Sequence, residues 1–77
     1  MSYVEFLHDI GNRLRALRKA HGMTQREFAD SIEASTSAYG HYENGWHVMN
    51  IWTLRKLCER YGVSADELLG LELGDDR

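Results

Sequence analysis

The sequence predicts an all-α fold of five short helices. It contains no proline, and no stretch shows the alternation of apolar and polar residues that is typical of a half-buried strand. Apolar residues instead recur at spacings of three and four, which is the pattern of helices that bury one face. Five residues that favour helix N-caps precede these segments: Ser2, Thr24, Ser35, Asn50 and Ser64. A chain of 77 residues has the size of one domain, so we expect one compact bundle.

The first helix is expected to begin near Tyr3 and to end at Gly22. Ser2 can cap its N-terminus, and Glu5 stands three residues later, which is the spacing of a capping box. Its apolar stripe consists of Leu7, Ile10, Leu14 and Leu17. Gly22 can adopt the left-handed conformation that ends a helix. Met23, the next residue, is expected to face the core.

The middle of the chain predicts two short helices joined by a tight turn. The first is expected over residues 25–32, the turn at 33–35 and the second helix over residues 36–44. Thr24 and Glu27 have the spacing of a second capping box. The apolar residues of each helix share one face: Phe28, Ala29 and Ile32 in the first, and Ala38, Tyr39 and Tyr42 in the second. Two such helices with a three-residue connection cross steeply and share one core, as in a helix-turn-helix.

The fourth helix follows an apolar loop at 46–49. Asn50 can cap it and Gly62 can stop it, and Trp52 is expected to be half-buried in the core. Its apolar stripe consists of Ile51, Leu54, Leu57, Cys58 and Tyr61. We expect Cys58 to be a buried structural thiol, because it lies on this stripe.

A short fifth helix should follow Ser64, with Glu67 completing a third capping box. Three leucines are expected to fold back on the core: Leu68, Leu69 and Leu71. We therefore expect a single domain over residues 1–73. The acidic tail at 74–77 has nothing to bury and should fray.

The charge of the chain gives weak guidance about partners. The net charge is −3, but residues 1–60 carry eight basic and seven acidic side chains, whereas residues 61–77 carry one and five. Basic residues cluster in the first helix, at Arg13, Arg15, Arg18 and Lys19. A run of charges is usually a solvated face, so this polarity alone does not identify a ligand.

Several classes of function are disfavoured. One cysteine excludes an internal disulfide, and neither a membrane-spanning run nor a signal peptide is recognisable, so we expect a cytoplasmic protein with no membrane partner. Cys58 and the four histidines lack metal-ligand spacing, which predicts no metal and no cofactor. No catalytic arrangement or phosphate-binding glycine loop is recognisable, so we expect no enzymatic activity.

A set of residues from Ile10 to Leu69 shares its order and spacing with a known family. These residues are Ile10-Gly11, Leu14-Arg15, Leu17-Arg18, Gly22-Met23-Thr24-Gln25, Phe28-Ala29, Ser35, Tyr42-Glu43-Asn44-Gly45, Leu57-Cys58, Tyr61-Gly62-Val63-Ser64 and Leu68-Leu69. With them the chain resembles the phage repressor and Cro type of helix-turn-helix protein, the XRE family. The resemblance implies a lambda-repressor-like bundle of five helices. It also implies a sequence-specific DNA-binding transcriptional regulator, repressor-like, with its third helix in the major groove.

The resemblance also implies roles for particular residues. Thr36, Ser37 and His41 occupy positions that face base edges, whereas Gln25 and Asn44 occupy positions that contact phosphate. Two residues match a structural salt bridge between the first and third helices: Arg18 and Glu43.

Further candidate contacts rest on residue type. Trp46 can pack on the sugar-phosphate backbone or on a protein partner, or it can cover the edge of the core. Arg55 can reach phosphate, or it can be an ordinary surface charge of its helix. His41 has a similar second interpretation as a solvated surface histidine.

The chain departs from the family pattern in ways that concern the recognition helix. Glu33 stands where the family usually has glycine, and a positive φ there would cost about 1 kcal/mol. Gly40 should weaken the third helix by roughly 0.5–1 kcal/mol relative to alanine. That helix contains no Arg, Lys or Gln. Specificity then has to come partly from DNA shape, from water or from residues outside the helix.

Two questions stay open at this point. A regulator of this type binds a two-fold operator as a homodimer, at least on DNA, and the dimer contact could lie around Leu71 and Leu73 or around Tyr3 and Phe6. The alternative function is a protein-interaction module on the same fold, such as an antitoxin or an accessory regulatory subunit. The acidic tail, the absence of Arg and Lys from the third helix and the apolar loop at 46–49 favour that alternative.

Overall fold

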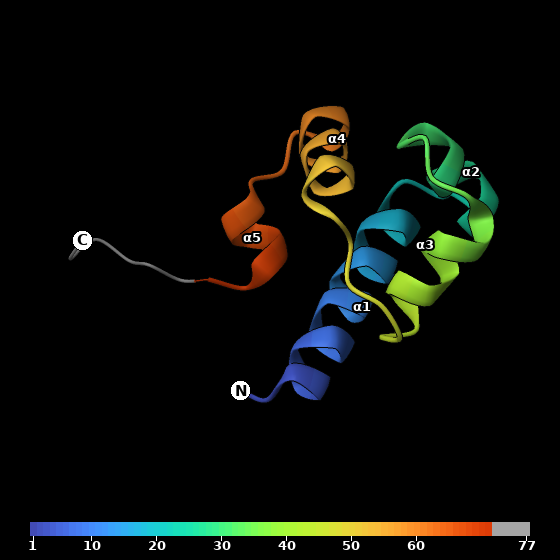
Figure 1. Cartoon of the computed structure of the whole chain (residues 1–77). Helices are drawn as coiled ribbons and strands as arrows, with labels where there is room; N and C mark the ends of the chain where they lie inside the picture. The colour runs from blue at the N-terminus through green and yellow to red at the C-terminus, as the bar shows by residue number, and fades with distance from the viewer. Residues whose placement is uncertain (72–77) are drawn as a thin grey trace.

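The computed structural model describes residues 1–71 and shows a bundle of five α-helices (Figure 1). They are α1 (Tyr3–Ala20), α2 (Gln25–Ser31), α3 (Thr36–Glu43), α4 (Ile51–Tyr61) and α5 (Ala65–Leu69). The described part of the chain contains no strand, which confirms the all-α prediction. Leu73 and the tail at 74–77 lie outside the described residues. None of the described helices is both long and apolar enough to cross a membrane.

The caps at the helix starts form as predicted, with one exception. Ser2 and Thr24 each make both hydrogen bonds of a capping box, with Glu5 and Glu27 respectively. The hydrogen bonds from the backbone of Ser2 and Thr24 have the largest effect on the Glu5 and Glu27 carboxyl groups and lower their pKa values. The side chains of Ser2 and Thr24 lower these pKa values further. The third capping box was predicted wrongly. Ser64 Oγ accepts the backbone N–H of Glu67, but the Glu67 carboxylate lies 3.3 Å from the Ser64 hydroxyl instead of binding its backbone N–H.

The helices end slightly earlier than the sequence predicted. Gly22 has a φ of 65°, as expected for a helix stop, but α1 already ends at Ala20. Ile32 and Asn44, expected as the last helical residues of α2 and α3, are C-cap residues instead. Their backbone N–H groups still point into the preceding turn, which is why a periodicity argument includes them.

The core lies where α1, α2 and α3 meet, and α4 and α5 close it. Its buried members are Ile10, Leu14, Phe28, Ala29, Ile32, Tyr39, Leu57 and Leu68. Aromatic packing orders its centre. The ring of Phe28 lies 5.0 Å from that of Tyr39 and stacks on that of Tyr61 at 4.7 Å, measured between centroids. Met23 packs against this core as expected.

The backbones of α1 and α3 touch at Gly11. A Cβ atom at this position would lie 2.3 Å from the carbonyl oxygen of Glu43 and 3.0 Å from that of Tyr42. Only glycine therefore allows the two helices to pack this closely. The end of α3 is thus held against the middle of α1.

Four apolar residues lie elsewhere than the sequence predicted. Trp52, expected to be half-buried in the core, is 65% exposed, and Ile51 at the start of the α4 stripe is 84% exposed. In the first turn of α4, Thr53 and Leu54 face the core instead, which leaves Ile51 and Trp52 on the outer side of the helix. Leu71 is also exposed, because the left-handed Gly70 ends α5 and leaves Leu71 outside. Cys58 is half-buried rather than buried, and this burial raises the pKa of its thiol.

Candidate nucleic-acid interface

Helices α2 and α3 form the helix-turn-helix expected in the middle of the chain. The turn between them contains Glu33, whose φ of 56° is the only positive value at a non-glycine residue between residues 1 and 71. Ser35 caps α3 by accepting the backbone N–H of Ala38. Phe28 of α2, the C-cap residue Ile32 and Tyr39 of α3 fill one shared core.

Helix α3 buries one side and exposes the other. Tyr39 and Glu43 are buried, whereas Thr36 and Ser37, in the first turn of the helix, are exposed. His41 is partly exposed and Asn44, the C-cap residue, is exposed. Of the residues predicted to contact bases, Thr36 and Ser37 are therefore open to solvent and His41 is partly so.

A buried carboxylate anchors α3 to the rest of the bundle. The side chain of Glu43 is fully buried and receives two hydrogen bonds from Arg18, one from Nε at 2.7 Å and one from Nη2 at 3.0 Å. Gln25 Nε2 donates to the same carboxylate at 3.2 Å, and Arg15 Nε does so at 3.3 Å. Arg18 also donates to the carbonyl of Met23. The carboxylate thus connects α1, the start of α2 and the end of α3.

Both partners of this ion pair have shifted pKa values. Burial opposes ionisation of Glu43, but the hydrogen bonds from Arg18 and the other donors outweigh burial and lower its pKa to about 2. The hydrogen bond to Glu43 raises the pKa of Arg18. Burial, followed by the nearby carboxylate, raises the pKa of Tyr39 above its ordinary value. The pair is charged throughout the physiological pH range.

Gln25 has a different environment from the one the resemblance suggested. It is the first residue of α2, as expected, but one N–H of its amide is bound to Glu43. A side-chain amide has a second N–H, which can still reach a ligand. Gln25 therefore connects the buried Glu43 carboxylate, which holds α3 in place, to the molecular surface beside α3.

The chain reverses at the end of α3 and forms an aromatic cluster. Gly45 has a φ of 74°, and the backbone N–H groups of Trp46 and His47 both point to the carbonyl of His41. The His41 ring lies 5.3 Å from the Trp46 ring and 4.9 Å from the His47 ring, measured between centroids. Trp46 is 63% exposed, so it does not cover the core edge.

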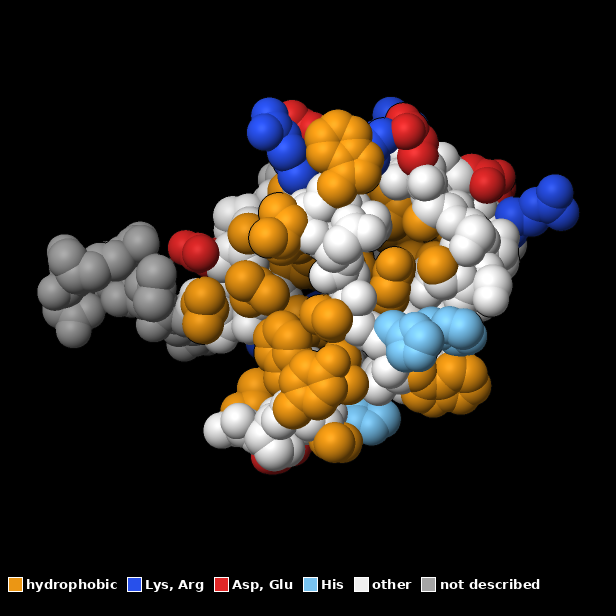
Figure 2. Space-filling view, viewed as in Figure 1, with side chains coloured by type: hydrophobic (Ala, Val, Ile, Leu, Met, Phe, Trp, Pro, Cys, Tyr) orange, Lys and Arg blue, Asp and Glu red, His pale blue; other side chains and the backbone are white. Residues whose placement is uncertain are grey.

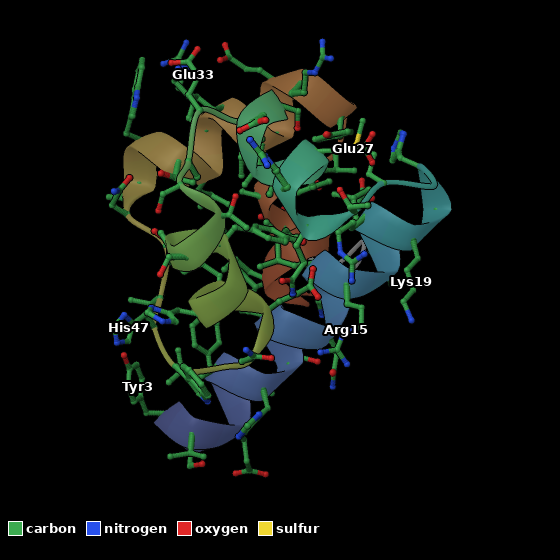
Figure 3. All side chains as sticks on the ribbon, turned by 90° about the vertical axis from the view of Figure 1, so that its right-hand side faces the viewer. Tyr3, Arg15, Lys19, Glu27, Glu33 and His47 are labelled. Carbon is green, nitrogen blue, oxygen red and sulfur yellow. The ribbon has the colours of Figure 1, made fainter. Side chains whose placement is uncertain are left out.

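The surface around α3 also carries residues outside the predicted set of contacts. Figure 3 looks onto this side of the molecule, with His47 at one edge of the α3 region and Arg15 and Lys19 of α1 at the other. The side chain of Arg15 is 44% exposed although its Nε faces Glu43. Arg15 and Lys19 lay within the basic cluster of the first helix. No sequence feature marked His47 as a residue of this surface, because its position depends on the turn at Gly45.

Arg55 lies apart from this group. It is on the exposed side of α4, where its guanidinium is 3.5 Å from the carboxylate of Glu59. Lys56, one residue on, lies over the ring of Trp52 and forms an ion pair with Glu33. Within residues 1–71, no three His, Cys, Asp or Glu side chains are grouped so as to hold a metal ion.

Comparison with known proteins gives matches over most of the chain. The family model described as a helix-turn-helix domain matches residues 9–71. The chain is 42% identical over 59 residues to the uncharacterised HTH-type transcriptional regulator YobD of Bacillus subtilis. This match covers 77% of this chain and 53% of that protein. It is 38% identical over 61 residues to the cryptic phage CTXphi transcriptional repressor RstR of Vibrio cholerae, covering 79% and 54%.

A third relative has a different kind of name. The chain is 33% identical over 61 residues to the antitoxin PezA of Streptococcus pneumoniae, which covers 79% of this chain and 39% of that protein. The matched region thus spans about half the length of these relatives, or less. The range matched by the family model, residues 9–71, includes α2 and α3.

Proposed function

Because this chain belongs to the helix-turn-helix domain family, in its phage-repressor (XRE) form, we propose that it is a sequence-specific, repressor-like transcriptional regulator that binds double-stranded DNA. Two of the relatives, YobD and RstR, are named a transcriptional regulator and a transcriptional repressor, which supports this function. Such a function implies a cytoplasmic location and involves no catalytic step. It also places α3 in the major groove.

The observation that carries the proposal is the two-sided character of α3. Glu43 is buried and held by Arg18, while Thr36 and Ser37 are exposed and His41 is partly exposed. A helix fixed in this way can enter a groove without losing its orientation. The hydroxyl groups of Thr36 and Ser37 can donate to or accept from base edges, and His41 can donate to N7 or O6 of guanine.

Phosphate contacts would come from residues around α3 and from one residue of α4. We assign them to Gln25 at the start of α2, to Asn44 and Trp46 at the end of α3, and to Arg55 on α4. Arg15 and Lys19 flank α3 on the α1 side and extend this set (Figure 3). Because α3 itself carries no Arg or Lys, these flanking groups would supply most of the electrostatic affinity.

The proposed DNA complex contains two copies of the chain. Domains of this kind bind half-sites about 34 Å apart, one helical turn of DNA, so that each α3 enters one of two successive major grooves. The operator would then be approximately palindromic. A homodimer, at least on DNA, follows from this symmetry.

Selection of duplexes from a random pool tests the proposal. The purified chain is incubated with the pool at about 0.1 M salt, and bound duplexes are sequenced. We expect a two-fold consensus with half-site centres about 10 base pairs apart. A pool without enrichment after repeated rounds would refute sequence-specific binding. The Thr36→Ala/His41→Ala variant serves as the matched control, because its pool should lose the consensus while the protein remains folded.

One observation favours a second candidate, a protein-interaction module. Trp46 and Val48 are both exposed in the loop after α3, and the relative PezA is named an antitoxin. Salt dependence separates the two candidates. The affinity of a DNA complex falls steeply as salt rises, since phosphate contacts release counterions, whereas an apolar protein contact changes little.

A further inference from the structure

The surface that α3 presents to a ligand carries no fixed positive charge of its own. Residues 36–50, from the start of α3 to the cap of α4, include no Lys and no Arg. Their one carboxylate, that of Glu43, is buried and paired with Arg18. The side chains of this stretch that can become cations are His41 and His47, because an ordinary histidine changes its charge between about pH 5 and about pH 8. Positive charge at this surface therefore depends on pH.

The turn at Gly45 brings these two histidines together. The backbone N–H of Trp46 donates to the carbonyl of His41 at 2.8 Å, and the backbone N–H of His47 donates to the same oxygen at 3.4 Å. The two imidazole rings lie 4.9 Å apart, measured between centroids. His47 is exposed and His41 is partly exposed. Figure 2 shows histidine side chains gathered in one region of the surface.

The groups around this pair do not supply a compensating negative charge. None of the ion pairs formed within residues 1–71 includes a histidine. The carboxylate of Glu43 faces the guanidinium groups of α1, and residues 46–54 contain no acidic side chain. On the side of α1, the titratable neighbour of the turn is His8, whose Nδ1 would lie 2.7 Å from a Cβ atom at Gly45. An acidic ligand can therefore provide the negative charge that the pair lacks.

We propose that His41 and His47 bind duplex DNA in their protonated form, His47 at a phosphate and His41 at the adjoining base edge. This inference rests on the proposed DNA-binding function and deepens it. Two protonated rings repel each other at this separation, so the free chain resists charging both. A nearby phosphate favours the charged form of each ring. DNA binding therefore takes up protons, and the affinity rises as the pH falls.

Protonation also changes what each ring can donate. A neutral imidazole has one N–H donor, whereas a protonated imidazole has two. A protonated His47 can therefore donate to a phosphate oxygen through either nitrogen, and this hydrogen bond is charge-assisted. Asn44 and Trp46, which we assign to phosphate, precede His47 in the same turn, and Figure 3 shows His47 at the edge of the α3 region. His47 thus extends the proposed set of phosphate contacts.

The expected coupling is large enough to measure. A histidine that is neutral in the free chain and charged on DNA takes up one proton, so log K changes by up to about one for each pH unit. Between about pH 8 and about pH 6, we expect the affinity for one duplex to rise about tenfold or more. The charged His47 also adds a phosphate contact, so the slope of log K against log salt should be steeper at the lower pH by roughly 0.9.

Fluorescence titrations with the whole chain, at constant ionic strength and at about pH 6 and about pH 8, test the proposal. The probes are the duplex recovered by selection and a random-sequence duplex of the same length. The natural sequence should bind both probes more tightly at the lower pH. His41→Gln and His47→Gln should each lose part of that dependence, and the double variant should lose nearly all of it. His21→Gln is the matched control, because His21 packs against the ring of Tyr61, and it should keep the full dependence.

Nuclear magnetic resonance of the imidazole protons gives an independent measurement. On the duplex, His41 and His47 should keep their charge to a higher pH than in the free chain, whereas His21 should titrate alike in both. An equal effect of inorganic phosphate would assign the pair to a free anion and overturn the proposal. Affinity that is independent of pH, or a double variant that keeps the natural dependence, would overturn this inference alone. A chain that binds no duplex at either pH would overturn the proposed function as well.

Discussion

The carbonyl oxygen of Glu43 lies so close to the backbone of Gly11 that a Cβ atom at Gly11 would approach it to 2.3 Å. Gly11→Ala should therefore separate α1 from α3. We expect a loss of about 2–3 kcal/mol in the free energy of unfolding, as for other overpacked core sites. Chemical denaturation of the purified variant measures this loss.

Gly40→Ala is the control for that substitution and a prediction of its own. A Cβ at Gly40 would meet only Gln25 Oε1 within 4 Å, at an ordinary contact distance of 3.7 Å. Alanine also favours the helix, so this variant should gain about 0.5–1 kcal/mol of stability. If both alanine variants lost the same amount of stability, the close approach at Gly11 would not be the cause.

Glu33 carries backbone strain that glycine would relieve. Its φ of 56° is unfavourable for a residue with a Cβ, so Glu33→Gly should stabilise the chain by about 0.5–1 kcal/mol. Glu33→Ala keeps the strain, and like the glycine variant it removes the ion pair with Lys56. Both variants lack the ion pair, so thermal denaturation should rank glycine above alanine, and the reverse order would show that the positive φ carries no net strain.

Acid should destabilise the fold through Glu43. Its pKa is about 2 in the folded chain, below the ordinary value of a glutamate. The stabilisation is therefore complete above about pH 5 and is lost as the pH falls through the folded value, for a total of about 3 kcal/mol. Carbon-13 titration of the side-chain carboxyl groups would locate the inflection. An inflection of Glu43 near pH 4 would show that Arg18 does not stabilise the carboxylate.

The outward face of α3 should control sequence preference. Thr36→Ala with His41→Ala should reduce the ratio of operator to random-duplex affinity by tenfold or more, at about 1–3 kcal/mol for each good base contact. Lys19→Ala should instead weaken both complexes alike and lower the salt slope by about 1. Fluorescence titrations with both duplexes distinguish these patterns. An unchanged ratio in the double variant would remove Thr36 and His41 from base recognition.

Helix positions could be predicted from the sequence because caps and stops are local signals. Ser2, Thr24 and Ser35 each accept a backbone N–H at the helix start that they were expected to cap. The ends of the apolar stripes could not be predicted in the same way. Periodicity shows which side of α4 is apolar, but not where along its axis the neighbouring helices stop, so Ile51 and Trp52 were misplaced.

The candidate site was predictable in part. The outward side chains of α3 and the pairing of Arg18 with Glu43 followed from the family resemblance. The contact of Gln25 with Glu43 and the position of His47 depend on distances between helices, which residue spacing does not contain. Gly11 illustrates the same limit, since a glycine inside a helix usually indicates only low helix propensity.

The residue that fixes α3 to the bundle, the buried Glu43, is distinct from the residues that α3 exposes to a ligand. Substitutions at Thr36, Ser37 and His41 leave the anchor untouched, so the outer face can vary at little cost in stability. Libraries randomised at these three positions should therefore remain folded at high frequency. The scaffold is accordingly suited to retargeting, in which new operators are reached by exchanging a few exposed side chains.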